Sequence, residues 1–201
     1  MVDRERIGGI GICGSGGFVL SAAQVDRRIK AVVTAALVDI SRLAANGPTG
    51  DLSNEARGAY FDALAEQRYA DFLNPQPVLG PRGAAIGFDD DTDPVWREFG
   101  TFYSTPRGYH PNSITQFTAA SDLAFANFAS LSHLDWISPR PILLIAGDQA
   151  FSRSFSEDVY QAASEPKELL LVPGANHVDM YDRTDLIPFD RIEEFFTKHL
   201  A

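Results

Sequence analysis

The sequence predicts an α/β protein built on a parallel sheet, and two observations carry this prediction. Short apolar runs of strand length alternate with segments of helical length near both ends of the chain. The first apolar run ends in a cluster of very small residues, which is typical of a sharp turn from a buried strand into a helix. The predicted strands are residues 7–12, 31–38, 142–147 and 168–172.

The turn after the first strand has the size pattern of a nucleophile elbow, in the run Gly11-Ile12-Cys13-Gly14-Ser15-Gly16. In such an elbow, G-x-Nu-x-G, the apex residue is strained and exposed, and the residues two positions away are small. With Cys13 at the apex the flanking positions are all small, whereas with Ser15 there Phe18 would crowd the crossing. Cys13 is therefore the predicted nucleophile.

A thiol suits this position chemically. At a helix N-terminus it lies at the positive end of the helix dipole, which predicts a pKa below the ordinary value of about 8.5. The backbone N–H of Gly14 would point at an oxyanion held over the sulfur. Two other interpretations stay open: an inert buried cysteine in a glycine-rich turn, and a phosphate-binding loop, for which Asp39 comes rather late as the acidic residue.

The second strand is predicted from the apolar, partly β-branched run 31–38, which is typical of a strand buried on both faces. Asp39 follows this strand directly. Its carboxylate would lie at the active edge of the sheet or would cap a helix over residues 40–45, and both interpretations stay open.

Residues 46–138 differ in character and predict a mainly helical insertion between two parts of one domain, 1–45 and 139–201. A helix is predicted over 54–73. The acidic run 89–93 lacks the later bidentate glutamate of a calcium loop, so a solvated turn is predicted, with Asp93 capping the next helix. The many aromatic residues between 96 and 128 are predicted to be mostly core, and some could line an apolar acyl pocket.

The α/β pattern returns after residue 139, with a helix predicted over 154–163 and a closing amphipathic helix over 187–200. Ser154 and Glu157 have the spacing of a capping box. His177 lies just past the last predicted strand, at the edge where α/β sheets carry their chemistry. A single histidine is more often structural, but the order nucleophile, acid, base makes His177 the predicted general base. We expect it to face Cys13 from an adjacent or near-adjacent strand.

Composition limits the class of protein. The chain has 201 residues and a mass of 22.0 kDa, which is enough for one domain with a real core. The net charge of −10 argues against nucleic acid as a partner. No apolar run approaches the roughly 20 residues of a membrane-spanning helix. A single cysteine and a charged start without an apolar signal segment predict a cytoplasmic protein.

Several stretches taken together resemble the dienelactone-hydrolase-like α/β-hydrolases. They are Glu5-Arg6-Ile7-Gly8, the elbow from Gly11 to Gly17, Asp26-Arg27-Arg28-Ile29-Lys30-Ala31-Val32, Ile137-Ser138-Pro139-Arg140-Pro141 and Gly174-Ala175-Asn176-His177. The resemblance implies the α/β-hydrolase fold with a helical cap insertion, no metal and no cofactor. It also implies hydrolysis of a small ester, lactone or thioester by a Cys/Ser–acid–His triad, in which Cys13 is the nucleophile and His177 the base.

The chain departs from the family pattern at the acid. In the family this residue follows the glycine that ends the third strand by three or four positions, where the present chain has Ala150 and Phe151. Asp148 is the predicted substitute, and Asp39 is the alternative acid.

A second departure concerns the start of the sheet, because the family elbow comes after about four strands and only six residues precede the first strand here. The sheet is therefore expected to be truncated to about four parallel strands, with residues 7–12 at an apolar, unpaired edge. A homodimer or a complementing N-terminal half is the expected partner. Two functions stay open: a hydrolase that forms an acyl-enzyme on Cys13, and a catalytically silent half-hydrolase that binds a partner chain or an apolar ligand.

Overall fold

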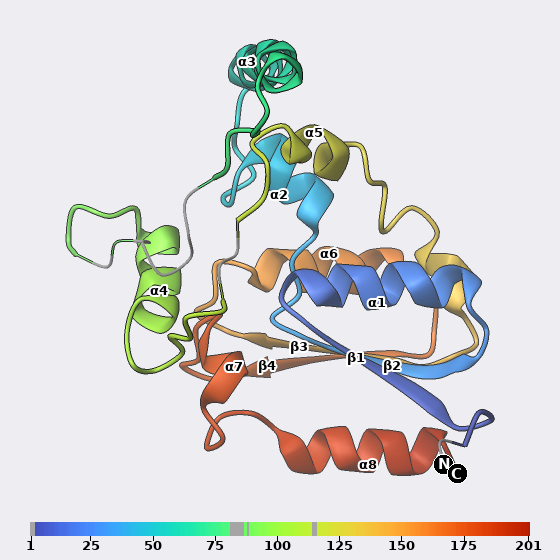
Figure 1. The fold of residues 1–201 in the computed structure, drawn as a ribbon. Coiled ribbons are helices and arrows are strands. Elements are labelled where there is room, and N and C mark those ends of the chain that lie inside the picture. The colour runs from blue at the N-terminus through green and yellow to red at the C-terminus, as the bar shows by residue number, and fades with distance from the viewer. Residues whose placement is uncertain (1–2, 81–86, 88, 114–115) are drawn as a thin grey trace. The chain divides into compact units, whose positions relative to one another are not determined.

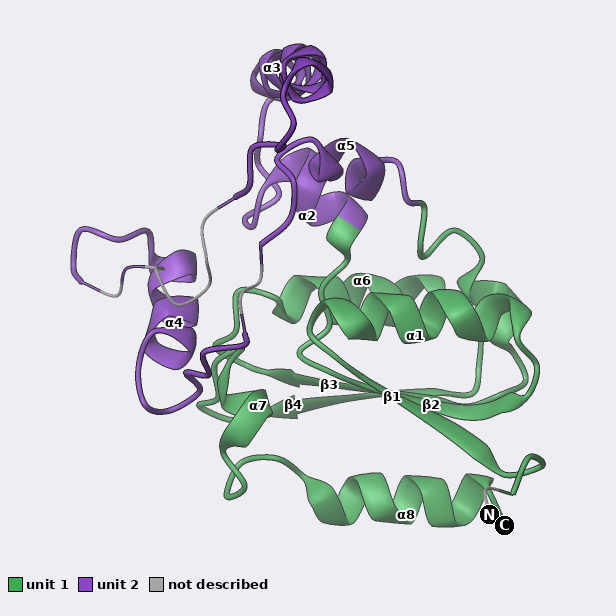
Figure 2. Cartoon of the chain, viewed as in Figure 1, with its two compact units in different colours: residues 1–40, 129–201 green, residues 41–128 purple. Residues whose placement is uncertain are grey.

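The computed structural model describes residues 3–80, 87, 89–113 and 116–201. The chain divides into two compact units, one formed by residues 1–40 and 129–201 and the other by residues 41–128 (Figure 2). The first unit therefore joins the two ends of the chain. The boundaries of the second unit lie five and ten residues before those predicted for the insertion, 46 and 138.

The first unit is built on a four-stranded sheet in the order β1-β2-β3-β4, and all neighbouring strands are parallel (Figure 1). The strands are β1 (Ile7–Ile12), β2 (Ile29–Ala35), β3 (Ile142–Gly147) and β4 (Lys167–Val172). The prediction of a parallel sheet of about four strands is confirmed, and β1 is one of its two outer strands. Ile10 and Ile12 on β1 are 54% and 43% exposed.

Helices cover both faces of this sheet. The helical segments of the first unit are α1 (Gly14–Val25), the 3-10 helix η2 (Leu134–Ile137), α6 (Arg153–Ala162), α7 (Asp179–Asp182) and α8 (Phe189–His199). Helices α1 and α6 lie on one face and α8 lies on the other (Figure 1). Phe195 of α8 belongs to one buried apolar cluster with Val33, Leu143 and Ile145 of the central strands. All residues of β3 are buried. A strand covered on both faces is apolar at every position, which is why an unbroken apolar run predicted this strand.

The second predicted strand ends three residues earlier than expected, at Ala35 instead of residue 38. Ala36 takes a positive φ of 49°, which ends the extended conformation. Its N–H still donates to the carbonyl oxygen of Ile145 at 2.9 Å, so the turn stays attached to β3. The run is equally apolar on both sides of this turn, and for that reason the strand end was not visible in the sequence.

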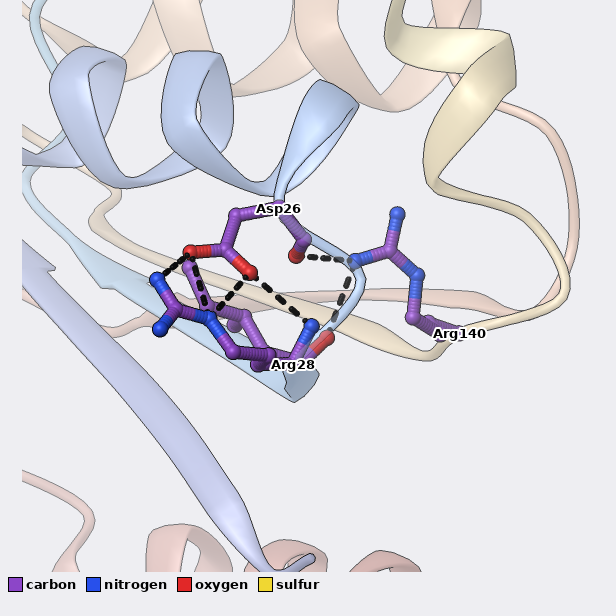
Figure 3. Close-up of polar contacts among 4 residues, drawn as sticks. Asp26, Arg28 and Arg140 are labelled. Atoms are coloured by element: carbon purple, nitrogen blue, oxygen red, sulfur yellow. Dashed lines mark hydrogen bonds and ion pairs between the residues drawn. The ribbon is translucent and has the colours of Figure 1, made fainter. Parts of the chain in front are cut away.

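A buried arginine, Arg140, links the end of α1 to the start of β2 (Figure 3). The Arg140 guanidinium donates to the carbonyl oxygens of Ala23 (2.5 Å), Asp26 (3.0 Å) and Ile29 (2.9 Å), where α1 ends and β2 begins. The last carbonyl groups of a helix have no N–H partner within the helix, and the Arg140 guanidinium supplies the missing donors. Next to it, hydrogen bonds from Arg28 lower the pKa of Asp26 to about 2.

The second unit is mainly helical over its described residues. Its helices are α2 (Ile40–Asn46), which begins one residue before the unit boundary, α3 (Asn54–Leu73), α4 (Pro94–Tyr103) and α5 (Ser121–Ala126). The predicted cap of α4 is confirmed, because the Asp93 carboxylate accepts from the N–H groups of Val95 and Trp96. None of the described helices is long and apolar enough to cross a membrane.

The prediction that most aromatic residues of this unit are core is wrong. Four of them are between 42% and 58% exposed: Trp96, Tyr109, Phe117 and Phe128. Among the described residues of the unit, only Leu64 and Val95 are buried apolar side chains. The aromatic rings instead contact one another in pairs along the chain, as Phe99 does with Tyr103 and Phe117 with Phe125.

Candidate active site

Cys13 lies at the apex of the turn between β1 and α1 in a strained backbone conformation, with φ 57° and ψ −129°. A non-glycine residue rarely adopts a positive φ, and such strain persists only where surrounding contacts impose it. The Cys13 N–H donates to the carbonyl oxygen of Ala35 at 3.0 Å, and its carbonyl accepts from the N–H of Gly16 (2.9 Å) and Val38 (3.0 Å). These three hydrogen bonds hold the strained residue in place.

The small neighbours of Cys13 are required by close backbone approach. A Cβ on Gly11 would lie 2.2 Å from the carbonyl oxygen of Ser15, and a Cβ on Gly16 would lie 2.7 Å from a side-chain carbon of Leu37. The first is a clash with backbone that excludes any side chain on Gly11, whereas the second requires the Leu37 side chain to move. The size pattern that placed Cys13 at the apex therefore has a direct steric cause.

The Cys13 thiol is hydrogen-bonded by the backbone N–H of Gly14 and by the Tyr181 side chain. Burial raises the pKa of Cys13, and these two hydrogen bonds lower it by less. The prediction of a lowered thiol pKa is therefore wrong. The helix end was read from the sequence, but the loss of water around the sulfur comes from tertiary packing and has the larger effect.

His177 is fully buried in the loop after β4. Its Nε2 lies 2.7 Å from the hydroxyl of Tyr181, and its Nδ1 lies 2.6 Å from the hydroxyl of Ser152. The ring also packs on Phe151, with centroids 4.8 Å apart. Burial lowers the pKa of His177 to about 3, so the imidazole is neutral at physiological pH.

The structure brings Cys13 and His177 together through Tyr181, whose hydroxyl contacts both side chains. The carboxyl ends of β1 and β4 lie at the same edge of the parallel sheet. The prediction of adjacent or near-adjacent strands is wrong, however, since β1 and β4 are the two outer strands. Cys13 and His177 are brought together by the segments that follow β1 and β4, and not by pairing of these two strands.

The two candidate acids have other places. Asp148 follows β3 and accepts a hydrogen bond from the backbone N–H of Gly174 at 2.7 Å, which joins the loop after β3 to the loop after β4. Asp39 lies immediately before α2. In a triad the acid contacts Nδ1 of the histidine, and here Nδ1 of His177 is hydrogen-bonded to Ser152. The assignment of Asp148 or Asp39 as the triad acid therefore stays a prediction, and this contact does not support it.

Sequence reasoning missed both hydroxyl partners of His177. The predicted capping box is wrong: α6 begins at Arg153, Ser152 occupies the N-cap without capping by its side chain, and Glu157 pairs with Arg153 at 2.8 Å. The Ser152 hydroxyl contacts the imidazole instead. Tyr181 had a weak signal, since it follows His177 by four residues, one helical turn. Within the described residues, no group of three or more His, Cys, Asp or Glu is placed to hold a metal ion.

Comparisons with known proteins find relatives that are longer than this chain. No family model matches the sequence. The protein PA2218 of Pseudomonas aeruginosa is 47% identical over 207 residues, which cover 99% of this chain and 54% of that protein. YcjY of Escherichia coli is 31% identical over 182 residues, covering 90% of this chain and 59% of that protein. The chain therefore spans little more than half the length of these curated relatives.

Solved structures agree with the sheet and helices described above. The crystal structure of PA2218 superposes with a TM-score of 0.92 over 98% of this chain and 62% of that chain. The α/β hydrolase GrgF from Penicillium sp. sh18 has a TM-score of 0.76 at 19% identity, over all of this chain and 66% of GrgF. DcsB, solved with a substrate analogue, has a TM-score of 0.78 at 20% identity, over all of this chain and 66% of DcsB. The narrower resemblance to dienelactone-hydrolase-like proteins stays a prediction, and the chain has the α/β-hydrolase fold.

Proposed function

We propose that this chain is a thiol-dependent hydrolase that cleaves a small ester, lactone or thioester through an acyl-enzyme on Cys13. The observation that carries the proposal is the strained apex at Cys13, whose sulfur accepts the Gly14 N–H and contacts the Tyr181 hydroxyl. Backbone strain of this kind is concentrated at functional sites. A structural cysteine needs neither a positive φ nor a donor aimed at its sulfur.

In the proposed reaction the sulfur attacks the acyl carbon and the thiol proton passes to His177. The carbonyl electron pair moves onto oxygen, where the Gly14 N–H stabilises the oxyanion. Collapse expels the alcohol or thiol with a proton from His177, and water then hydrolyses the acyl-cysteine. Because the thiol pKa is raised and His177 is held neutral, the resting pair is uncharged, and the proton leaves the sulfur as the attack occurs.

Hydrolysis of p-nitrophenyl acetate, a small activated ester, tests the proposal. The wild-type chain is expected to release a burst of p-nitrophenolate and to gain one acetyl group by mass spectrometry. Cys13→Ala abolishes both, while Ser15→Ala, at the other candidate apex, retains them. Equal hydrolysis by the wild type and Cys13→Ala, with no acetyl adduct, would refute the assignment.

A second candidate function is a catalytically silent half-hydrolase whose outer strand binds another chain. The apolar edge strand β1, with Ile10 and Ile12 exposed, favours this candidate. Such an edge seldom stays unpaired in water. Light scattering on the wild type and Ile10→Lys tests it: a wild-type dimer that the lysine dissociates supports pairing through β1, and a wild-type monomer at high concentration excludes self-pairing.

A further inference from the structure

One hydroxyl, that of Tyr181, occupies the position between the nucleophile and the base. The ring nitrogen Nε2 of His177 lies 2.7 Å from this hydroxyl, and the same hydroxyl hydrogen-bonds with the Cys13 thiol. A ring nitrogen makes one in-plane hydrogen bond. With Nε2 engaged by Tyr181, a proton from the sulfur reaches the ring through the phenol.

The direction of these hydrogen bonds depends on which ring nitrogen carries the proton. A neutral imidazole has one N–H and one acceptor. If Nδ1 carries the proton, it donates to Ser152, Nε2 accepts from Tyr181, and Tyr181 accepts from the thiol. If Nε2 carries the proton, donor and acceptor exchange roles in each of these hydrogen bonds. Nε2, the nitrogen on the side of the nucleophile, then cannot accept a proton. The first tautomer is therefore the one that can act as a base.

We propose that Tyr181 is a catalytic residue that carries the proton between the Cys13 thiol and Nε2 of His177, and that Ser152 is a positioning residue that holds the imidazole in its Nδ1–H tautomer. This inference rests on the proposed function and adds two residues to it. The partner of the histidine is then a neutral hydroxyl on the N-cap of α6.

The transfer is balanced and leaves Tyr181 unchanged. The S–H bond breaks as sulfur bonds to the acyl carbon, its proton moves to the tyrosine oxygen, and the tyrosine proton moves to Nε2. The phenol is neutral before and after the step, and the positive charge resides on the imidazolium. In the collapse of the tetrahedral intermediate, the proton returns along the same path to the leaving group.

Three variants and a matched control test the proposal. Tyr181→Phe removes only the hydroxyl and keeps the ring that packs edge-on against His177 at 5.3 Å. Tyr160→Phe makes the same change on α6, where the ring contacts Lys167 instead. Ser152→Ala removes the Nδ1 partner, and Ser152→Thr restores a hydroxyl. Circular dichroism confirms that each variant is folded before it is assayed.

The measurements are the p-nitrophenolate burst rate, the iodoacetamide alkylation rate of Cys13 across pH, and the ¹⁵N shifts of the His177 ring, assigned with His177→Gln. Tyr181→Phe is expected to slow the burst on the order of 10²- to 10⁴-fold, the usual contribution of a proton-transfer group. Alkylation at pH 7 is expected to slow about 10- to 100-fold, because a hydrogen bond to the thiolate is lost. Tyr160→Phe is expected to change neither rate. Ser152→Ala is expected to shift the ring toward the Nε2–H tautomer, and Ser152→Thr to restore it.

Different outcomes overturn different claims. A wild-type burst that Tyr181→Phe retains or accelerates overturns the relay and identifies Tyr181 as a spacer, while the proposed hydrolase function stands. A burst that Cys13→Ala does not abolish refutes the proposed function. The alkylation rates, which need no substrate, then decide on Tyr181 by themselves. An unchanged Nδ1–H tautomer in Ser152→Ala overturns the role of Ser152.

Discussion

The strain at Cys13 predicts that a glycine at this position is more stable than an alanine, the reverse of the usual order. The comparison of Cys13→Gly with Cys13→Ala removes the sulfur from both variants, so only the Cβ differs between them. At φ 57° and ψ −129°, an L residue is strained by about 1–3 kcal/mol. Glycine loses about 0.5–1 kcal/mol more backbone entropy on folding than alanine does. The net expectation is that Cys13→Gly is more stable by up to about 2.5 kcal/mol.

Ala22→Gly on α1 is the matched control, because Ala22 is exposed and lies in a regular helix of the same unit. This substitution is expected to lower stability by about 1 kcal/mol. Unfolding in urea is followed by the fluorescence of Trp136 in a Trp96→Phe background, so that the signal reports on the first unit alone. The refuting result is the usual order at the elbow, in which Cys13→Gly has a lower free energy of unfolding than Cys13→Ala. If that difference equals the loss caused by Ala22→Gly, the elbow holds no strain and the argument from φ fails.

Three further predictions concern stability. Gly58→Ala is expected to stabilise α3 by about 1 kcal/mol in thermal melts followed by circular dichroism, because the new methyl group meets no atom within 4 Å; a loss of stability would contradict the open surroundings. Arg140→Met is expected to cost roughly 3 kcal/mol or more in urea unfolding, since several buried carbonyls lose their donor, and Arg140→Lys should lie between it and the wild type. His177, with a folded pKa of about 3 and an unfolded one near 6.5, binds its proton more readily when unfolded, so stability should fall by about 1.4 kcal/mol per pH unit as the pH drops from about 6.5 toward 3. His177→Gln should flatten the slope of stability against pH in this window, and an equal slope in both proteins would show that His177 is not buried neutral.

The core of the first unit was predictable because its signals are local. A buried parallel strand is a continuous apolar run, and all four strands were found in this way. β4 begins one residue earlier than predicted, and both ends of β2 are displaced, by two and three residues. Ala36 ends that strand by turning the backbone, and nothing in an alanine side chain announces a positive φ. The elbow was also predictable from local sequence, because the close packing at Gly11 and Gly16 favours glycine, and a cluster of glycines is visible in the sequence.

The immediate surroundings of His177 were not predictable, because they depend on which side chains the fold brings to a buried ring. Ser152 resembled one of several serines near a helix start, and only its contact with Nδ1 distinguishes it. The direction of the pKa shift of Cys13 was missed for a related reason. A helix terminus is visible in a sequence, whereas the packing that excludes water from the sulfur is assembled from segments far apart in the chain.

The division of the first unit between the two ends of the chain has a consequence for how the protein folds during synthesis. Val32 on β2 pairs with Ile142 on β3, 110 residues later, whereas the other two strand pairings join segments close in sequence. At a translation rate of about 5–20 residues per second, β2 waits roughly 5–20 s on the ribosome before its second neighbour is made. During that interval the edge of β2 that pairs with β3 and the face of the sheet that α8 covers have no partner from the chain, whereas α1, made earlier, can already cover the other face. Slow codons within 41–128 should therefore lower the yield of folded chain, and a chaperone that shields apolar strands should restore it.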